Sequence, residues 1–444
     1  MPLGVPRPRL SSRRAGHARR GLGVAGLTLM LCGSCKTGCE LLHPRRHAST
    51  AARVAVATKR DCASSDWVCY GHDAQRTSTS PGRCTGPLRE LWHFRPDPPN
   101  GRKATLFHAI ATSDAVYASG VIGESPAVYR IGLDGQQAWV FDTRVDISHA
   151  QWPLFAHNHV VLDDDGVYIL NPQTGTKLFD RGLDWWGQAI ADPARLYLVN
   201  EWHVDGPPVL VGAFDPEGHD IWQQNVSGTV REDVQDAVGA IALDQGTLFQ
   251  AVEYRYIPFW GLFAFDAATG HPRWTVDVHP TSAISAGSGK VYLVEREGRG
   301  QPESLAARSE RTGELVWRSP VQRLDETAPA LVSDLVLTFS HEDGLSAWDE
   351  ADGHARWTRF VVDSAGEATE HATHIAVAAG SRTLVVAIGS TLAVLDLKDG
   401  RELWRSDEPD GSNPHLHSPV IAHGRVYLMS DTGLRAFACA TEDP

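Results

Sequence analysis

The 444-residue sequence predicts an all-β fold, an eight-bladed β-propeller of four-stranded antiparallel blades whose ring is closed by the N-terminal strand. Two observations predict this fold. A short motif that ends on an aromatic residue recurs at intervals of roughly 40 to 50 residues, which is the length of a propeller blade. Two apolar runs separated by a polar, glycine-containing turn precede each copy, so each repeat supplies four strands. The composition, 42 % hydrophobic and 21 % charged, excludes a disordered or fibrous chain.

The chain begins with a segment that is typical of export. The first 35 residues contain six arginines and no acidic residue, and the apolar run Leu22–Leu31 that follows the arginines is too short to span a bilayer. Gly33 and Ser34 precede Cys35, and this order resembles the lipobox of bacterial lipoproteins, in which the cysteine becomes the lipidated first residue. Cleavage without lipidation is the alternative. We expect residues 1–35 to be a lipoprotein-type export signal.

Residues 36–85 are expected to form a tether and a lead-in, and residues 86–444 the propeller. The motif is clearest in Ala264–Trp274, which reads AFDAATGHPRW. Each copy is a short apolar strand, a turn with glycine where the backbone needs a positive φ, and a second strand that ends on the aromatic residue. Related copies are Ala307–Trp317, Ala347–Trp357 and Val394–Trp404, and looser ones end at Trp139, Phe179 and Trp222.

The two ends of the repeat region complete each other. The segment Leu88–Phe94 carries an eighth motif aromatic, Trp92, with no three strands before it, whereas the last unit, residues 415–439, has three strands and no fourth. Joining the two gives eight complete blades and removes the open edges that would invite aggregation.

The register of this join predicts a disulfide. Cys439 holds the place in the last blade that lies seven residues before the closing tryptophan in an intact unit, and residue 85 lies seven before Trp92. We therefore expect a Cys84–Cys439 disulfide, which leaves Cys62 and Cys69 to pair with each other. Free thiols or another pairing are the alternative.

The motif Ala-x-Asp-x-x-Thr-Gly-x-x-x-Trp resembles the tryptophan-docking repeat of the PQQ-type propellers, the superfamily of quinoprotein alcohol dehydrogenases and of BamB-like outer-membrane lipoproteins. The resemblance covers about residues 60 to 440, because the segment Asp66–Asp73 is also similar to the lead-in of these chains. It implies the fold and the packing role of the repeated residues, since the tryptophan docks on the neighbouring blade. It implies much less about function.

The loops that lead into the innermost strands should gather at one mouth of the central channel. They are rich in histidine and carboxylate, which suggests a site for a cation, a metal or a small polar ligand. A solvated mouth that tolerates any polar residue is the alternative. The candidate residues are His108, His149, Asp236, His279, Glu326, His371, His374, His415 and His417.

No catalytic or cofactor-binding residue is assigned. The resemblance implies that a quinoprotein dehydrogenase needs a calcium or lanthanide held by Glu and Asn, an Asp base and, in the alcohol dehydrogenases, adjacent cysteines. No adjacent cysteine pair stands in the propeller and no Asn stands among those loop positions. PQQ with calcium is therefore disfavoured as a cofactor.

An aromatic loop is the candidate partner-docking site, with Tyr254, Tyr256, Phe259 and Trp260 beside an arginine. The alternative is that this loop folds down over its own blade. The net charge of −13 makes nucleic acid an unsuitable partner. We expect a monomeric, non-catalytic propeller, anchored by lipid on the periplasmic side of the cell envelope or at the cell surface, that binds envelope proteins. The alternative is a PQQ- or metal-dependent dehydrogenase, or a small-ligand binder that uses the channel mouth.

Overall fold

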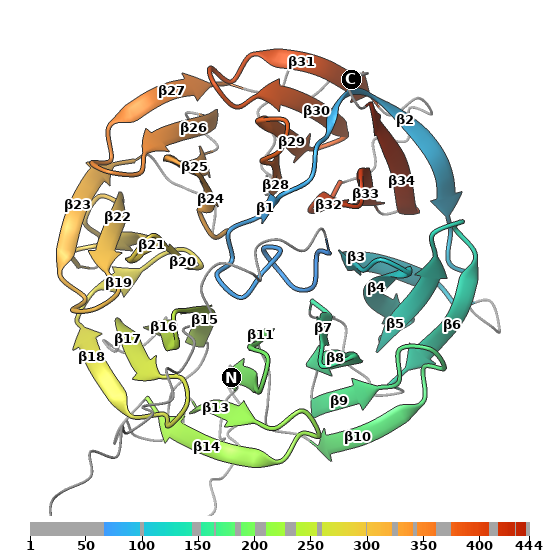
Figure 1. The fold of residues 1–444 in the computed structure, drawn as a ribbon, viewed down its shortest axis with the longest axis horizontal. Helices are drawn as coiled ribbons and strands as arrows, with labels where there is room; N and C mark the ends of the chain where they lie inside the picture. Colours follow the sequence, from blue (N-terminus) through green and yellow to red (C-terminus); the bar gives the residue numbers. More distant parts are fainter. Residues whose placement is uncertain are drawn as a thin grey trace, which may run out of the picture. The chain divides into compact units, whose positions relative to one another are not determined.

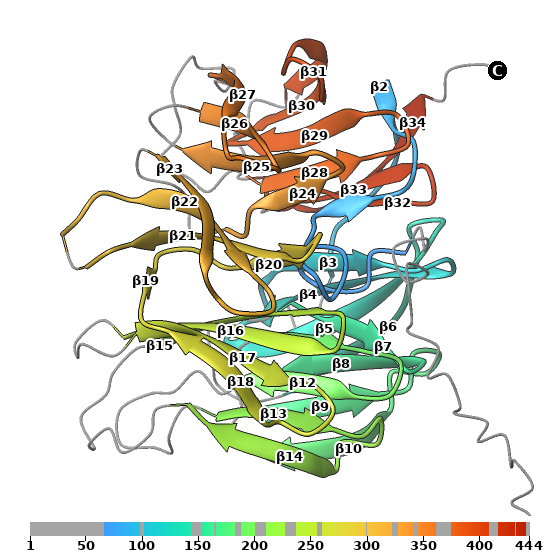
Figure 2. The same cartoon turned by 60° about the vertical axis from the view of Figure 1, so that its left-hand side comes forward.

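Eight antiparallel sheets follow one another around a common centre, which confirms the predicted eight-bladed β-propeller (Figure 1). The computed structural model describes residues 66–97, 102–143, 152–163, 166–182, 188–199, 210–226, 237–254, 260–298, 300–321, 327–340, 344–360, 374–407, 416–430 and 432–440. They belong to one unit, Ala55–Pro444. In Figure 2 the strands of each blade lie side by side. No helix in these ranges is long and apolar enough to cross a membrane.

The first four blades each contain four strands in sequence order from the centre outwards, with hairpin connections between neighbours (Figure 1). Blade 1 consists of β3 (Ala104–Ala111), β4 (Ala115–Ile122), β5 (Ser125–Gly132) and β6 (Gln137–Asp142), and blade 2 of β7 (Leu154–Ala156), β8 (His159–Asp163), β9 (Gly166–Leu170) and β10 (Lys177–Gly182). Blade 3 consists of β11 (Ala189–Ala191), β12 (Leu196–Val199), β13 (Leu210–Phe214) and β14 (Asp220–Asn225), and blade 4 of β15 (Ala237–Asp244), β16 (Thr247–Tyr254), β17 (Trp260–Asp266) and β18 (Pro272–Val276).

The later blades keep this order with two additions at the centre. Blade 5 consists of β19 (His279–Pro280) and β20 (Ser285–Gly287), which both pair with β21 (Lys290–Arg296), then β22 (Ser304–Ser309) and β23 (Leu315–Pro320). Blade 6 consists of β24 (Ala330–Val332), β25 (Leu335–Ser340), β26 (Gly344–Asp349) and β27 (Ala355–Arg359). Blade 7 consists of β28 (His374–Ala378), β29 (Thr383–Ile388), β30 (Thr391–Asp396) and β31 (Glu402–Asp407), with β1 (Thr79–Ser80) pairing in parallel with β28.

The ring closes as the sequence predicts. Blade 8 consists of β32 (Val420–Ala422), β33 (Arg425–Ser430) and β34 (Gly433–Ala440), and its outermost strand is the N-terminal β2 (Thr85–Phe94), antiparallel to β34. The predicted Cys84–Cys439 disulfide is present, with the two Cα atoms 4.8 Å apart. The strand that comes first in the blade region therefore completes the blade that comes last.

The second predicted pairing, Cys62 with Cys69, is wrong. Cys69 is a free thiol, 2 % exposed, whose Sγ donates a hydrogen bond to the backbone oxygen of Asp73 at 3.1 Å. It packs against Leu154 and Leu196, and this burial raises the pKa of the thiol to about 12. Cys62 lies outside the described residues. Pairing by elimination failed because a buried cysteine can serve as a small apolar residue.

The aromatic residue of each repeat docks on the next blade. At the joint between blades 5 and 6, the indole of Trp317 donates from Nε1 to the backbone oxygen of Glu350 at 3.0 Å and lies against Gly353. Gly353 has a φ of +76°, and a Cβ added there would lie 2.5 Å from the indole. Both the backbone conformation and the lack of space therefore require glycine at this position. The repeated Trp and Gly are therefore the residues through which neighbouring blades pack on each other.

Candidate functional site

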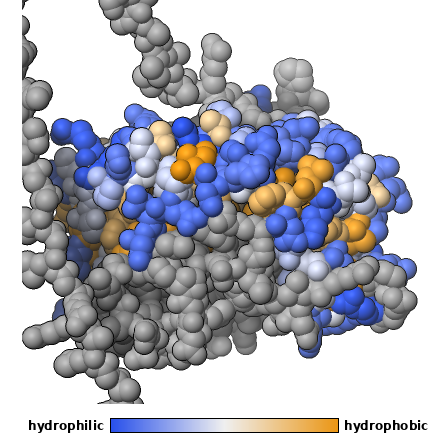
Figure 3. Space-filling view, turned by 90° about the horizontal axis from the view of Figure 1, so that it is seen from below, coloured by the Kyte–Doolittle hydropathy of each residue, from blue (hydrophilic) through white to orange (hydrophobic). Residues whose placement is uncertain are grey.

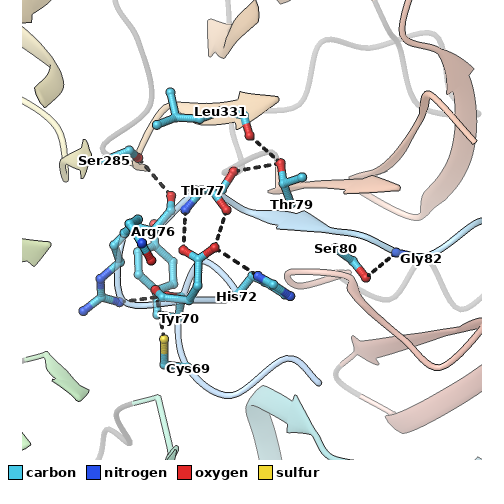
Figure 4. Close-up of polar contacts among 12 residues, drawn as sticks. Cys69, Tyr70, His72, Arg76, Thr77, Thr79, Ser80, Gly82, Ser285 and Leu331 are labelled. Atoms are coloured by element: carbon cyan, nitrogen blue, oxygen red, sulfur yellow. Dashed lines mark hydrogen bonds and ion pairs between the residues drawn. The ribbon is translucent and has the colours of Figure 1, made fainter. Parts of the chain in front are cut away.

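A segment of the N-terminal lead-in crosses the centre of the ring (Figure 1 and Figure 4). This lead-in segment, residues 66–82, exchanges backbone hydrogen bonds with the innermost strands. Trp67 and Ala111 of β3 donate to each other at 2.7 and 2.9 Å. Backbone N–H groups of five further blades also donate to it, namely those of Phe155, Leu243, Ala286 and Leu331 from blades 2, 4, 5 and 6, and those of Val377, Ala379 and Gly380 from blade 7.

Side chains lock the lead-in segment in place. Arg76 is 1 % exposed, donates from Nε to the backbone oxygen of Ile241 at 2.9 Å, and lies with its guanidinium 4.9 Å from the ring centre of Tyr70. Asp73 accepts hydrogen bonds from both the backbone N–H and the hydroxyl of Thr77, at 3.0 and 2.6 Å. A segment so fully hydrogen-bonded is part of the folded propeller rather than part of a tether.

A small hollow, with about 30 Å³ of space for water-sized molecules, lies beside the lead-in segment. Residues of the lead-in segment and of four blades line it, and none of these described lining residues carries a charge. Prominent among them are Trp67, Tyr70, Trp152, Ala328, Ile375 and Ser418. The lining suits a neutral, largely apolar group.

Two of the predicted channel-mouth histidines lie in one aromatic cluster beside this hollow. His108 stacks on Trp152, with ring centres 4.4 Å apart, and Tyr70 contacts the same indole at 5.1 Å. Phe107 meets His417 edge to face at 6.2 Å. The cluster joins β3, the loops before β7 and β32, and the lead-in segment, so it brings together positions far apart in the sequence.

A third predicted histidine lies elsewhere. His279, 5 % exposed, stacks on Trp260 with ring centres 4.7 Å apart. Trp260 belongs to the predicted docking loop, so the structure joins a residue of one predicted site to a residue of the other. Its indole is half-buried, which limits its use as a free contact surface.

The remaining candidates are not described as side chains. His374 opens β28 and Tyr254 ends β16, and only their backbone is described. Outside the described residues lie His149, Asp236, Glu326, His371, His415, Tyr256, Phe259 and Cys35. Within the ranges that the structure covers, no three His, Cys, Asp or Glu side chains come close enough to hold a metal. The metal-binding interpretation therefore stays a prediction.

Sequence reasoning missed the part played by Trp67, Tyr70 and Trp152. The lead-in was expected only to precede the first blade strand, whereas it forms the floor of the central hollow. One signal was available, because the stretch Asp66–Asp73 carries two aromatic residues and a cysteine, an apolar content that a solvated tether does not need.

The outer rim offers a different kind of surface. Figure 3 shows a mainly hydrophilic side with apolar side chains scattered over it. Several exposed apolar residues directly precede a docking aromatic on an outermost strand, namely Leu178, Ile221, Val316 and Leu403, at 54, 44, 49 and 41 % exposure. Single apolar residues of this kind are common on protein surfaces.

Fold and repeat together define the class: a β-propeller built from tryptophan-docking blades, closed by its N-terminal strand. The family model for the outer membrane protein assembly factor BamB matches residues 89–299, 208–361 and 301–441, and the chain belongs to this family.

Two relatives carry the name of the same family. A BamB from Alkalilimnicola ehrlichii is 28 % identical over 167 residues, which are 35 % of this chain and 40 % of that protein. A BamB from Burkholderia pseudomallei is 21 % identical over 318 residues, or 66 % of this chain and 75 % of that protein. The match thus spans less than half the length of the first of these relatives.

Two crystal structures share the fold. BamB from Moraxella catarrhalis superposes with a TM-score of 0.57 at 15 % identity, covering 81 % of this chain and all of that one. Quinohemoprotein alcohol dehydrogenase from Comamonas testosteroni superposes with a TM-score of 0.61 at 12 % identity, covering 85 and 81 %. At such identities these likenesses concern the fold alone.

Proposed function

We propose that this protein is an exported, lipid-anchored, non-catalytic propeller that presents a rigid surface on which envelope proteins dock. The observation that carries the proposal is the family match over residues 89–441, because the family and both of its relatives bear the name of an outer-membrane protein assembly factor. The N-terminal order of arginines, an apolar run and Cys35 supports export and anchoring.

The central channel also supports a scaffold. The lead-in segment fills the floor with hydrogen bonds between backbone groups, and the hollow beside it is lined by uncharged side chains. Chemistry on a polar substrate needs acids, bases or a metal close to the reacting atoms. The described lining of this hollow offers aromatic rings and small side chains instead.

Photo-cross-linking in intact cells tests the proposal. A photoreactive amino acid at Tyr256 in the docking loop should capture an envelope protein, whereas one at Leu178, an exposed residue on the rim of blade 2, serves as the matched control. The variant Tyr256→Ser with Phe259→Ser should weaken capture by a probe at position 254 and leave the thermal midpoint unchanged. If the probes at positions 254 and 256 capture no envelope protein, the scaffold proposal fails.

A second measurement addresses catalysis and anchoring. Purified protein incubated with PQQ and calcium should keep its melting temperature and should not reduce a dye with alcohols or sugars. A shift together with dye reduction would refute the non-catalytic assignment. Cys35→Ser should move the protein from the membrane fraction to the soluble fraction, and unchanged fractionation would refute the lipid anchor.

A further inference from the structure

Two glutamates occupy equivalent places in neighbouring blades. The docking tryptophan of blade 4, Trp274, donates from Nε1 to the backbone oxygen of Glu310 at 2.8 Å, and Trp317 of blade 5 donates to that of Glu350 at 3.0 Å. Other joints have a buried apolar side chain here, as Ala267 and Leu397 show at 2 and 0 % exposure. A carboxyl group in this position needs a partner that offsets its loss of water.

Glu350 has such a partner. Lys290 of β21 places its Nζ 2.5 Å from a carboxylate oxygen of Glu350, and the hydroxyl of Tyr292 donates to the same oxygen. Lys290 lies opposite Gly287 at the end of the β20–β21 hairpin. A lysine ammonium thus neutralises the partly buried carboxylate of Glu350 at the joint between blades 5 and 6.

Glu310 lacks this lysine. In the matching β15–β16 hairpin, Thr247 lies opposite Asp244, so threonine stands where the neighbouring blade has Lys290 and Asp244 stands where it has Gly287. Phe249, which contacts the docking Trp274, replaces Tyr292. The joint between blades 4 and 5 therefore has neither the lysine nor the tyrosine of the neighbouring joint, and it has a second carboxyl group, that of Asp244.

The two carboxyl groups meet in a buried place. Glu310 and Asp244 are 8 and 9 % exposed, and Asp244 lies close enough to Glu310 to raise the pKa of its carboxyl group. A hydrogen bond between two carboxyl groups requires a proton on one of them. The Oε1 atom of Glu310 has no hydrogen-bond partner. Gln75 of the lead-in segment donates to Oδ1 of Asp244 at 3.3 Å, so the pair joins blade 4, blade 5 and the channel floor.

We propose that Asp244 and Glu310 share one proton, which takes the place of the missing lysine, and that this proton makes the joint between blades 4 and 5 sensitive to pH. Two carboxylates at hydrogen-bonding distance repel each other in a buried site, so loss of the proton weakens the joint. The repulsion acts on Asp244, which also accepts the hydrogen bond from Gln75, and thereby on the lead-in segment.

The groups around the pair fit this assignment. The backbone N–H of Gly287 donates to Glu310, and Tyr292 of β21 lies close enough to be affected by its charge. Lys290 is bound to Glu350, while Arg273 of β18 pairs with Asp266 and donates to the hydroxyl of Thr247. These two cations are thus committed to other acceptors.

The direction of the pH effect follows from linkage. Burial, and after it the charge of Asp244, raise the pKa of Glu310 from 4.5 to about 8. Between these values the folded state binds the proton and the unfolded state does not. The contribution of this pair to stability is therefore greatest below the unfolded pKa, falls as the pH rises from that value to about 8, and levels off above it.

Melting temperatures of the full chain from about pH 4 to about pH 9.5 test the proposal, because this range spans the interval from the unfolded to the folded pKa of Glu310. The wild type should lose several degrees relative to Glu310→Gln, whose amide carries no titrating proton, and the two curves should converge at the acidic end. Glu350→Gln is the matched control. It should melt lower throughout because Lys290 loses its partner, and it should keep the wild-type pH slope.

Asp244→Asn provides a second readout that does not depend on how Glu310→Gln folds. It should reduce the pH slope, since the charge of residue 244 no longer adds to the effect of burial on the pKa of Glu310. Parallel curves for the wild type and both variants would overturn the proposal. Calcium that restores the melting temperature at alkaline pH in the wild type, and in neither variant, would also overturn it, because the pair would then hold a metal ion.

Discussion

Removal of the ring-closing disulfide should destabilise the protein mainly through its unfolded state. Cys84 and Cys439 are 355 residues apart, so their bond closes nearly the whole described propeller into one loop. In the chain-entropy treatment a loop of this length removes about 20 cal/mol/K from the unfolded ensemble, or about 6 kcal/mol at 25 °C. Residual structure in the unfolded chain lowers this value, and we expect a loss of about 3 to 6 kcal/mol in Cys84→Ser/Cys439→Ser.

The native ring should survive this change. The hydroxyls of Ser381 and Thr383 hydrogen-bond to the backbone of Cys84, and β2 keeps its pairing with β34 without the sulfur bridge. The contacts that hold the closure together therefore remain in the double variant.

Chemical denaturation followed by tryptophan fluorescence is the assay. The midpoint should fall and the denaturant dependence should rise, because the unfolded chain is now free to expand. Cys69→Ala serves as the control for cysteine removal as such. Equal midpoints for the wild type and the double variant would refute the entropic reasoning, and loss of native fluorescence without denaturant would refute the claim that β2 holds the ring closed.

Two further predictions concern the blade joints and the channel floor. Gly353→Ala should cost about 3 kcal/mol, since its Cβ would meet the Trp317 indole at 2.5 Å, whereas Gly424→Ala, with similar φ but no atom within 4 Å, should cost about 1 to 2 kcal/mol; equal losses in denaturation curves would contradict the docking role. Arg76→Met should leave the backbone oxygens of Ile241 and Tyr70 without their guanidinium donors, lower stability by about 2 to 3 kcal/mol, and expose the lead-in segment to limited proteolysis. Cleavage no faster than in the wild type would show that the backbone bonds alone hold the segment.

The fold was predictable because its signal is local and repeated. A docking aromatic residue, a turn glycine and two apolar strands recur in each unit. Counting along an intact copy therefore gave even the closing register of β2 on β34 and the Cys84–Cys439 bridge. The bond from a tryptophan Nε1 to a backbone oxygen of the next blade recurs at one joint after another.

The channel floor was not predictable in the same way. The lead-in segment is held by hydrogen bonds between backbone groups, such as those from Leu243 to Ala74 and from Ala286 to Gln75. Because almost every residue has these backbone groups, such bonds cannot be predicted from the side chains in the sequence. The pairing of Cys62 with Cys69 failed for a related reason, because elimination assumed that every exported cysteine is oxidised. The candidate histidines His108, His279 and His417 come from separate blades, so their spacing in the sequence carries no information about the distances between their side chains.

The closing strand also sets an order of assembly. A chain is made from its N-terminus, yet the hydrogen bonds of β2 are completed only by β34, whose last residue is Ala440, close to the end of the sequence. The lead-in segment likewise gains its backbone hydrogen bonds to blades 4 to 7 only after those blades have been synthesised. The first part of the propeller to be synthesised is therefore among the last to become structured, and a chain that stops before about residue 430 leaves its own beginning without a partner.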